Sequence, residues 1–287
     1  MGESFKFIHY FLFCLTFIAV LLTSIVLHPE GGEPSEVFSL IKENPSVVLN
    51  GLPFTLSLLF IIACHEYGHL YGAMKNGITA TKPYFIPAPP FITLGTFGAF
   101  IKIKSPISNR TALVETGAYG PIFGFVATTI VLFMGYFLDM SGYHTPVDFG
   151  FNVRPPMAMV LIKYLFYGKL NFEFMLFENP LAASAFIGFF IQGLNLLPVG
   201  QLDGGHLLYA AFTKSHRSIS KGIAILFIFL SPFGFHFLIW ALLFFILGTG
   251  HPPTLNDQLP LSRKDVYTVA LSFLIFLASF QPLPFVN

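Results

Sequence analysis

Six apolar runs constrain this chain more than any other feature of its sequence. They cover residues 7–27, 52–74, 113–138, 181–197, 223–248 and 266–280. The longer runs exceed the roughly 20 residues that a helix needs to cross about 30 Å of hydrocarbon. Lipid also admits only segments that satisfy their own backbone hydrogen bonds. We therefore expect an all-α polytopic membrane protein with six to seven transmembrane helices.

The uncertainty in this count comes from the fifth run. Ser231-Pro232-Phe233-Gly234 interrupts residues 223–248. Because proline removes a backbone donor and clashes with the preceding turn, this segment is either the turn of a helical hairpin or a kink in one long helix. The fourth run continues past Gly204, and the last run is short.

Composition excludes a soluble enzyme and argues against nucleic acid as a partner. Only 10% of the 287 residues are charged and 54% are hydrophobic, whereas about 25% of a soluble domain is charged. The formal net charge of +1 gives no electrostatic footprint for nucleic acid.

The first run is too long for a secretory signal and is not followed by a small-residue cleavage site, so it predicts a retained span.

Loop charges predict the orientation in the membrane, because Lys and Arg collect in short cytoplasmic loops. Residues 28–48 carry four acids and one Lys: Glu30, Glu33, Glu36, Glu43 and Lys42. Residues 75–110 carry only bases: Lys75, Lys82, Lys102, Lys104 and Arg110. Further bases follow the fourth run, at Lys214, Arg217 and Lys221. We expect the second and fourth runs to end together on the cytoplasmic side of a cell or inner membrane.

The strongest chemical signal is His65-Glu66-Tyr67-Gly68-His69, near the end of the second run. On a helix both imidazoles lie on one face and reach one zinc ion, with the adjacent Glu placed as a general base. The alternative is a fortuitous histidine pair at a polar helix end. Ionisable residues at membrane depth are costly and mark functional sites. We therefore expect zinc ligands at His65 and His69 and a catalytic base at Glu66.

A catalytic zinc usually has three protein ligands. Residues 195–206 interrupt the fourth run with Pro, Gly and one acid, Asp203, and membranes tolerate such non-helical backbone only beside protein or a water-filled cavity. Asp203 is the expected third ligand. It also suits an N-cap of the helix that follows, and His206 is a competing ligand.

A further segment, residues 95–104, is predicted to form a strand or hairpin. Apolar and charged residues alternate in its second half, it contains β-branched residues, and Pro106 follows it. The alternative is a packed re-entrant loop.

These motifs together resemble the site-2 protease family of intramembrane zinc metalloproteases, peptidase family M50. The zinc helix, the Asn195–Gly205 segment and Gly120-Pro121-Ile122-Phe123-Gly124 follow the family's order and cover about residues 54–212. The resemblance implies one Zn²⁺ held by His65, His69 and Asp203, with Glu66 as base. It also places Asn195 near the site, to stabilise the oxyanion or hold the substrate; the alternative for Asn195 is an interhelical hydrogen bond.

The expected function is that of a zinc metalloendopeptidase that cuts a membrane protein in or near a transmembrane segment, as in regulated intramembrane proteolysis. The expected partners are the transmembrane substrate, captured by strand addition, and the lipid bilayer. With loops shorter than an ordinary domain, residues 1–287 are expected to form one membrane-embedded domain with no PDZ or other soluble domain. A transporter would not need Glu66 beside His65, and no inverted repeat is visible. An inactive scaffold would not need the complete set of ligands and base.

Overall fold

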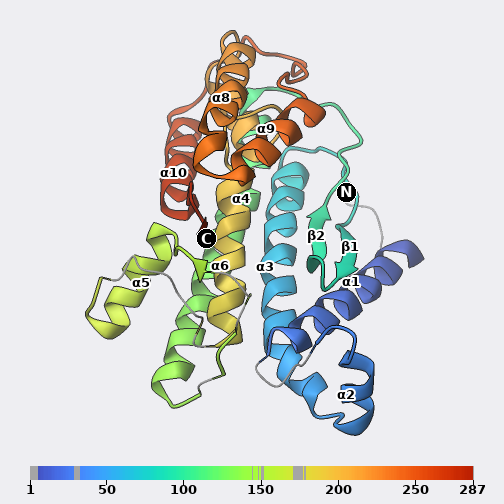
Figure 1. Ribbon diagram of the computed structural model, residues 1–287. Coiled ribbons are helices and arrows are strands. Elements are labelled where there is room, and N and C mark those ends of the chain that lie inside the picture. Colours follow the sequence, from blue (N-terminus) through green and yellow to red (C-terminus); the bar gives the residue numbers. More distant parts are fainter. Residues whose placement is uncertain are drawn as a thin grey trace.

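The computed structural model describes residues 6–28, 33–143, 145–147, 149, 152–170, 177 and 179–286, so Glu30 of the charge argument lies outside it. The described chain is mostly helical (Figure 1). Its helices are α1 (Phe7–Val26), α2 (Val37–Glu43), α3 (Val47–Lys75), α4 (Arg110–Met140), α5 (Met157–Tyr167), α6 (Pro180–Asn195), α7 (Asp203–Ala211), α8 (His216–Leu230), the 3₁₀ turn η1 (Ser231–Phe233), α9 (Phe235–Leu247) and α10 (Arg263–Ser279). The strands pair as β1 (Tyr84–Pro90) with β2 (Leu94–Phe100) and β3 (Asn152–Val153) with β4 (Phe285–Val286).

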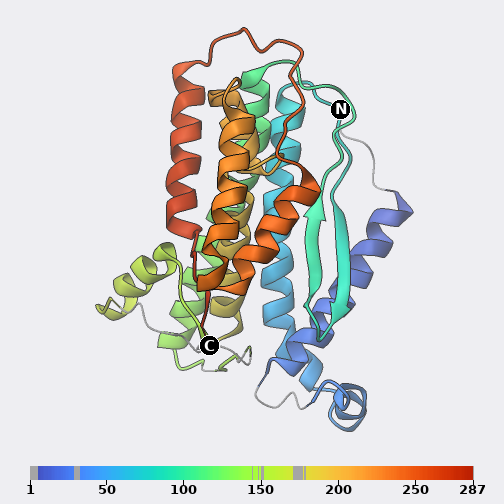
Figure 2. The ribbon, with the colours of Figure 1, turned by 45° about the horizontal axis from the view of Figure 1, so that its top comes forward.

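Helices α3, α4 and α6 form the centre of the molecule, where their contacts bury Leu58, Ile61, Leu132 and Phe189. Helix α1 and the β1–β2 hairpin flank α3, and α10 lies against α4 and α6 (Figures 1 and 2). The polar residues predicted to carry chemistry lie on these central helices or beside them.

Two glycines let α3 approach α4 backbone to backbone. A methyl group at Gly68 would lie 2.1 Å from the carbonyl oxygen of Tyr119, and one at Gly72 would lie 2.5 Å from that of Glu115. Small residues at helix contacts are a common route to close packing in membranes. The close approach fixes the His65–His69 turn against α4.

Three helices of the described chain are long and apolar enough to cross a membrane: Phe7–Val26, Val47–Lys75 and Arg110–Met140. Three shorter apolar helices are Met157–Tyr167, Pro180–Asn195 and Phe235–Leu247. The protein is therefore a mostly helical integral membrane protein with a small sheet. The three long helices account for the first three of the six to seven spans expected.

The interruption of the fourth run is visible as a break between α6 and α7. Residues 196–202 are non-helical, with Pro198 inside them and Gly200 at a φ of +55°. A methyl group at Gly204 would lie 2.0 Å from the carbonyl oxygen of Leu196. The glycine therefore lets α7 fold back tightly onto the break and places Asp203 at the start of the new helix.

The fifth run forms a helical hairpin rather than one kinked helix. Pro232 lies in the 3₁₀ turn η1 between α8 and α9. The two helices bury a shared cluster that includes Phe227, Phe237, Trp240 and Phe244. Of the two alternatives for Ser231–Gly234, the turn is therefore correct.

The predicted strand at residues 95–104 is part of a hairpin, with different bounds. The strand β2 runs from Leu94 to Phe100, and its pairing with β1 includes Tyr84 opposite Phe100 and Pro90 opposite Leu94. In residues 101–104 the pairing continues outside the strand as a bridge between Ile103 and Ala80, flanked by backbone hydrogen bonds from Thr81 to Lys102 and from Lys104 to Thr79. The sequence pattern did not mark β1 because its three prolines disfavour a strand assignment.

Candidate active site

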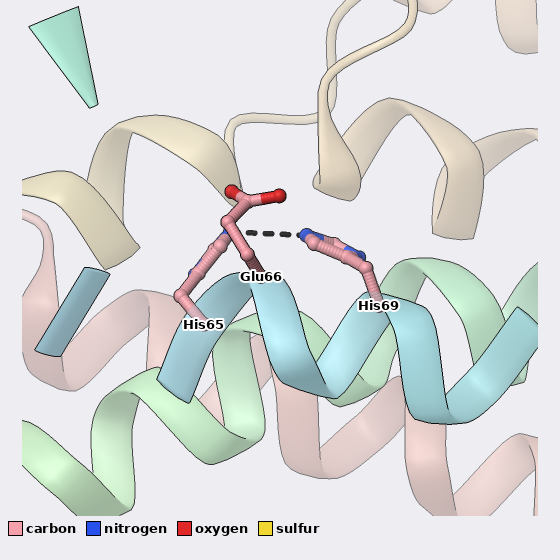
Figure 3. Close-up of side chains that lie close together, drawn as sticks. All are labelled: His65, Glu66 and His69. Atoms are coloured by element: carbon pink, nitrogen blue, oxygen red, sulfur yellow. Dashed lines mark hydrogen bonds between the residues drawn. The ribbon is translucent and has the colours of Figure 1, made fainter. Parts of the chain in front are cut away.

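His65, Glu66 and His69 project from the same part of α3, as Figure 3 shows. The Nε2 atoms of the two histidines are 3.0 Å apart, and a carboxylate oxygen of Glu66 lies within 4.8 Å of both imidazoles' nearest nitrogens. His65 and Glu66 are buried. The helical spacing of the motif thus brings two nitrogen donors and one carboxylate to a single point.

Asp203 reaches the same point from the start of α7. Its two carboxylate oxygens each lie 3.4 Å from an Nε2 atom, Oδ2 from that of His65 and Oδ1 from that of His69. The N-cap of α7 is Leu202, and the helix has no side-chain cap. The capping alternative for Asp203 is therefore wrong, and its carboxylate is directed at the histidines instead.

The second nitrogen of each histidine is also held. Nδ1 of His69 donates to the carbonyl oxygen of Thr116 at 2.8 Å, and Nδ1 of His65 donates to Oε1 of Gln192 at 2.8 Å. A proton on Nδ1 leaves Nε2 with its lone pair, which is the form that binds a metal. Both rings are therefore oriented with their donor atoms toward Asp203.

These distances fit one tetrahedral zinc ion. Ligand atoms 2.0 to 2.2 Å from a tetrahedral metal stand about 3.3 to 3.6 Å apart. The two histidine Nε2 atoms are 3.0 Å apart, and each lies 3.4 Å from an Asp203 oxygen, so all three separations are close to this range. Two imidazoles and a carboxylate also match the donor set of catalytic zinc sites. Glu66 belongs to the same group of donors, and its place beside the first histidine suits a base.

Asn195 lies at the end of α6 and reaches the site, with its Nδ2 atom 3.4 Å from Nε2 of His65. It lines a cavity of about 290 Å³ together with the three candidate ligands and Glu66. The rest of the lining comes from β2, the chain after it, α4 and the break before α7: Ala99, Phe100, Ile101, Ile103, Thr116, Gln201, Leu202 and His206. The candidate site is thus accessible through a partly polar cavity.

A second and more apolar cavity, of about 480 Å³, meets the first at the same residues. Both are lined by His65, Glu66, Ala99 and Asn195. The second extends between α3, α6 and β2, where its walls include Leu58, Ile61, Ile62, Thr96, Phe97, Gly98, Ile187, Phe190 and Ile191. His65 and Glu66 therefore lie where the two cavities join, and His69 and Asp203 line the first, partly polar cavity.

His206, the competing ligand, lies in the wall of the first cavity and has a different partner. Its Nδ1 atom is 2.7 Å from Nε2 of His251. The ring of His251 stacks on Tyr209, whose hydroxyl donates to Asp257 at 2.6 Å. This contact could not be predicted from the sequence, because residue 251 lies in the loop after α9, far from α7 in the chain.

The His65–His69 turn lies on a helix long enough to cross a membrane, and the carboxylate of Asp203 is directed at both imidazoles. This combination is typical of membrane-embedded zinc metalloproteases. The sequence signature of Peptidase family M50 matches residues 53–239, and the chain belongs to this family. The resemblance found in the sequence motifs is thereby confirmed, and zinc is the metal of the class.

Plant proteins are among the relatives. The chain is 29% identical over 245 residues to the probable zinc metalloprotease EGY2, chloroplastic, of Arabidopsis thaliana, which is 85% of this chain and 43% of that protein. It is 28% identical over 246 residues to EGY2 of Oryza sativa subsp. indica, 85% of this chain and 45% of that protein. The chain thus spans less than half the length of these relatives. No solved structure matches it.

Proposed function

We propose that this protein hydrolyses a peptide bond in or near a transmembrane segment of a membrane-protein substrate, as in regulated intramembrane proteolysis. The observation that carries the proposal is the convergence of His65, His69 and Asp203 in a partly polar cavity that meets an apolar cavity at His65 and Glu66. A site of this kind gives a lipid-embedded segment access to a hydrolytic centre.

In the proposed mechanism His65, His69 and Asp203 hold the metal. Zinc, when bound, supplies a Lewis acid that polarises a carbonyl and makes water nucleophilic at neutral pH. Glu66 accepts the proton of the attacking water and returns it to the leaving amine nitrogen. The amide of Asn195 donates to the oxygen of the scissile carbonyl or to the substrate strand. The role is supported by the place of Asn195 in the lining of both cavities, 3.4 Å from Nε2 of His65.

Strand addition is the proposed mode of substrate capture. A transmembrane helix hides its carbonyls in its own hydrogen bonds, so the segment to be cut must first unwind. Residues 96–99 of β2 line the apolar cavity beside the candidate ligands. The strand offers the unwound segment backbone partners, and the apolar walls accept its side chains.

The proposed topology keeps six to seven spans, with the site facing the cytoplasm. The additional spans come from the short apolar helix α6 and from the two helices of the α8–α9 hairpin. The bases of residues 75–110 and 214–221 support the orientation. Reporter fusions within residues 33–46 should report the exterior and fusions near Lys82 the cytoplasm, and the reverse pattern would overturn the orientation.

The test of the function is cleavage of a transmembrane model substrate by the purified full chain in lipid vesicles. The zinc-loaded protein should cut the substrate, and Glu66→Gln should lose turnover by at least about 100-fold, the usual contribution of a general base. Leu165→Gln, at an exposed position on α5 outside both cavities, is the control. Equal cleavage by the wild type and Glu66→Gln would contradict the mechanism.

A further inference from the structure

Gln192 is a buried polar residue whose role the sequence motifs leave unexplained. It lies on α6 with no exposed surface. Its Oε1 atom accepts from Nδ1 of His65 at 2.8 Å, and within the described chain its Nε2 atom is buried without a hydrogen-bond partner. Burying an amide with half of its polar atoms unpaired is costly. The one bond that it makes must therefore account for its presence.

That bond determines which nitrogen of His65 is available for a metal. His65 directs Nε2 toward His69 and Asp203, so Nδ1 must carry the proton and needs an acceptor. For His69 the acceptor is the backbone carbonyl of Thr116. For His65 it is the side chain of Gln192. Outer partners of this kind fix the ring orientation and tautomer of a metal-binding histidine.

Gly124 provides the space that Gln192 occupies. A methyl group at Gly124 would lie 2.2 Å from Nε2 and 2.7 Å from Cδ of Gln192. Gly124 is the last residue of the Gly120–Gly124 motif on α4. Any larger residue there would push the amide away from its place beside His65.

We propose that Gln192, seated against Gly124, is a positioning residue that holds His65 in the orientation and tautomer required for zinc binding. The inference rests on the ligand role of His65 in the proposed function. The competing account is that Gln192 merely joins α6 to α3.

The chain contains a matched control for that competing account. Ser57 donates to Oγ of Ser184 at 2.7 Å, which is another α3–α6 hydrogen bond at a buried position. Each serine lies eight residues before its counterpart in the His65–Gln192 pair, about 12 Å further along the helix. Ser184→Ala therefore removes an equivalent interhelical bond away from the candidate ligands.

The experiment measures zinc affinity by chelator competition on the purified full-length protein, with thermal unfolding recorded in parallel. Gln192→Met keeps the length of the side chain but removes the acceptor, and should weaken zinc binding by about 10- to 100-fold. Gln192→Glu keeps an acceptor oxygen and should bind zinc within a few-fold of the wild type. Ser184→Ala should keep wild-type zinc affinity.

Wild-type zinc affinity in Gln192→Met, or equal weakening in Ser184→Ala, would overturn the inference. If Gln192→Met does not fold, Gly124→Ala replaces it; weakened binding there is expected, and unchanged binding would overturn the inference. His65→Ala separates the two proposals. Full zinc affinity in His65→Ala would overturn the ligand set, whereas lost affinity there with normal affinity in Gln192→Met overturns the Gln192 inference alone.

Discussion

His251 is a titratable residue whose surroundings favour its neutral form. Burial lowers its pKa to about 4, and the ring faces His206, His216, Tyr209 and Asp257. Its Nε2 atom is 2.7 Å from Nδ1 of His206, which lines the active-site cavity. Protonation of His251 would therefore place a charge among neighbouring imidazoles and disturb that wall of the cavity.

Acid should consequently destabilise the protein through His251. An unfolded histidine has a pKa of about 6.5, above the folded value of about 4. Because the unfolded state binds the proton first, the free energy of unfolding falls as the pH is lowered between these two values. Thermal unfolding between pH 7 and pH 4.5 should show a smaller loss in His251→Gln than in the wild type.

His236→Gln, the same substitution in a residue that bonds to Pro282 instead, serves as the control. The neighbours His206 and His216 leave some acid dependence in every variant. An identical pH dependence for the wild type and His251→Gln would show that His251 is not responsible.

The sequence predicts the candidate ligands and base that the structure brings together, but not the groups that orient them. The His65–His69 motif and Asp203 could be predicted because their types and spacing follow from metal chemistry. The carbonyl of Thr116 could not, since any residue type supplies a backbone oxygen. Gln192 belongs to none of the motifs, and its bond to His65 depends on how α6 packs against α3.

At the level of helices, α4 shapes the site through two glycines, whose missing side chains leave space for neighbouring residues. The two glycines of the Gly120–Gly124 motif face different side chains: a methyl group at Gly120 would lie 2.1 Å from Nε2 of His69, and one at Gly124 would meet Gln192. The backbone carbonyl of Thr116, also on α4, accepts a hydrogen bond from His69. The motif therefore leaves room for His69 and for the Gln192 side chain that accepts a hydrogen bond from His65.

Gly120→Ala should consequently damage the site although alanine favours helix formation. Overpacking costs about 1 to 3 kcal/mol, and the displaced His69 should bind zinc less tightly. Gly222→Ala on α8 is the matched control, because a methyl group there meets nothing within 4 Å. It should be neutral or raise the free energy of unfolding by up to about 1 kcal/mol. Thermal unfolding and zinc affinity of both variants test this, and equal behaviour would contradict it.

The long helices were more predictable from the sequence than the strand β1 or the hairpin of α8 and α9. The apolar runs located the long helices because membrane spans need continuous hydrophobicity. The strand β1 was missed because Pro87, Pro89 and Pro90 suggest a loop, and it forms as the partner of β2 against α1. The hairpin of α8 and α9 was left open, since Pro232 is compatible with a turn or a kink and only packing decides between them.

In the whole molecule, His65 and Glu66 lie where an apolar cavity among the central helices meets a more polar one. In the proposed function, a substrate helix must unwind before its carbonyls reach the candidate ligands. Substrates with Gly or Pro near the cut should therefore be cleaved faster than a poly-Leu segment of equal length, because Gly and Pro destabilise a helix by about 1 and 3 kcal/mol relative to alanine. Cleavage rates in vesicles of one lipid composition measure this. Equal rates would remove the unwinding step from the account.

The most direct test of the central claim is the zinc content of the purified protein and its site variants. His65→Ala, His69→Ala and Asp203→Ala should each lose bound zinc, because each removes one of three ligands. Glu66→Gln should keep one zinc per chain while losing turnover. Full zinc content in Asp203→Ala would contradict the ligand set, as would loss of zinc in Glu66→Gln with zinc retained in a histidine variant.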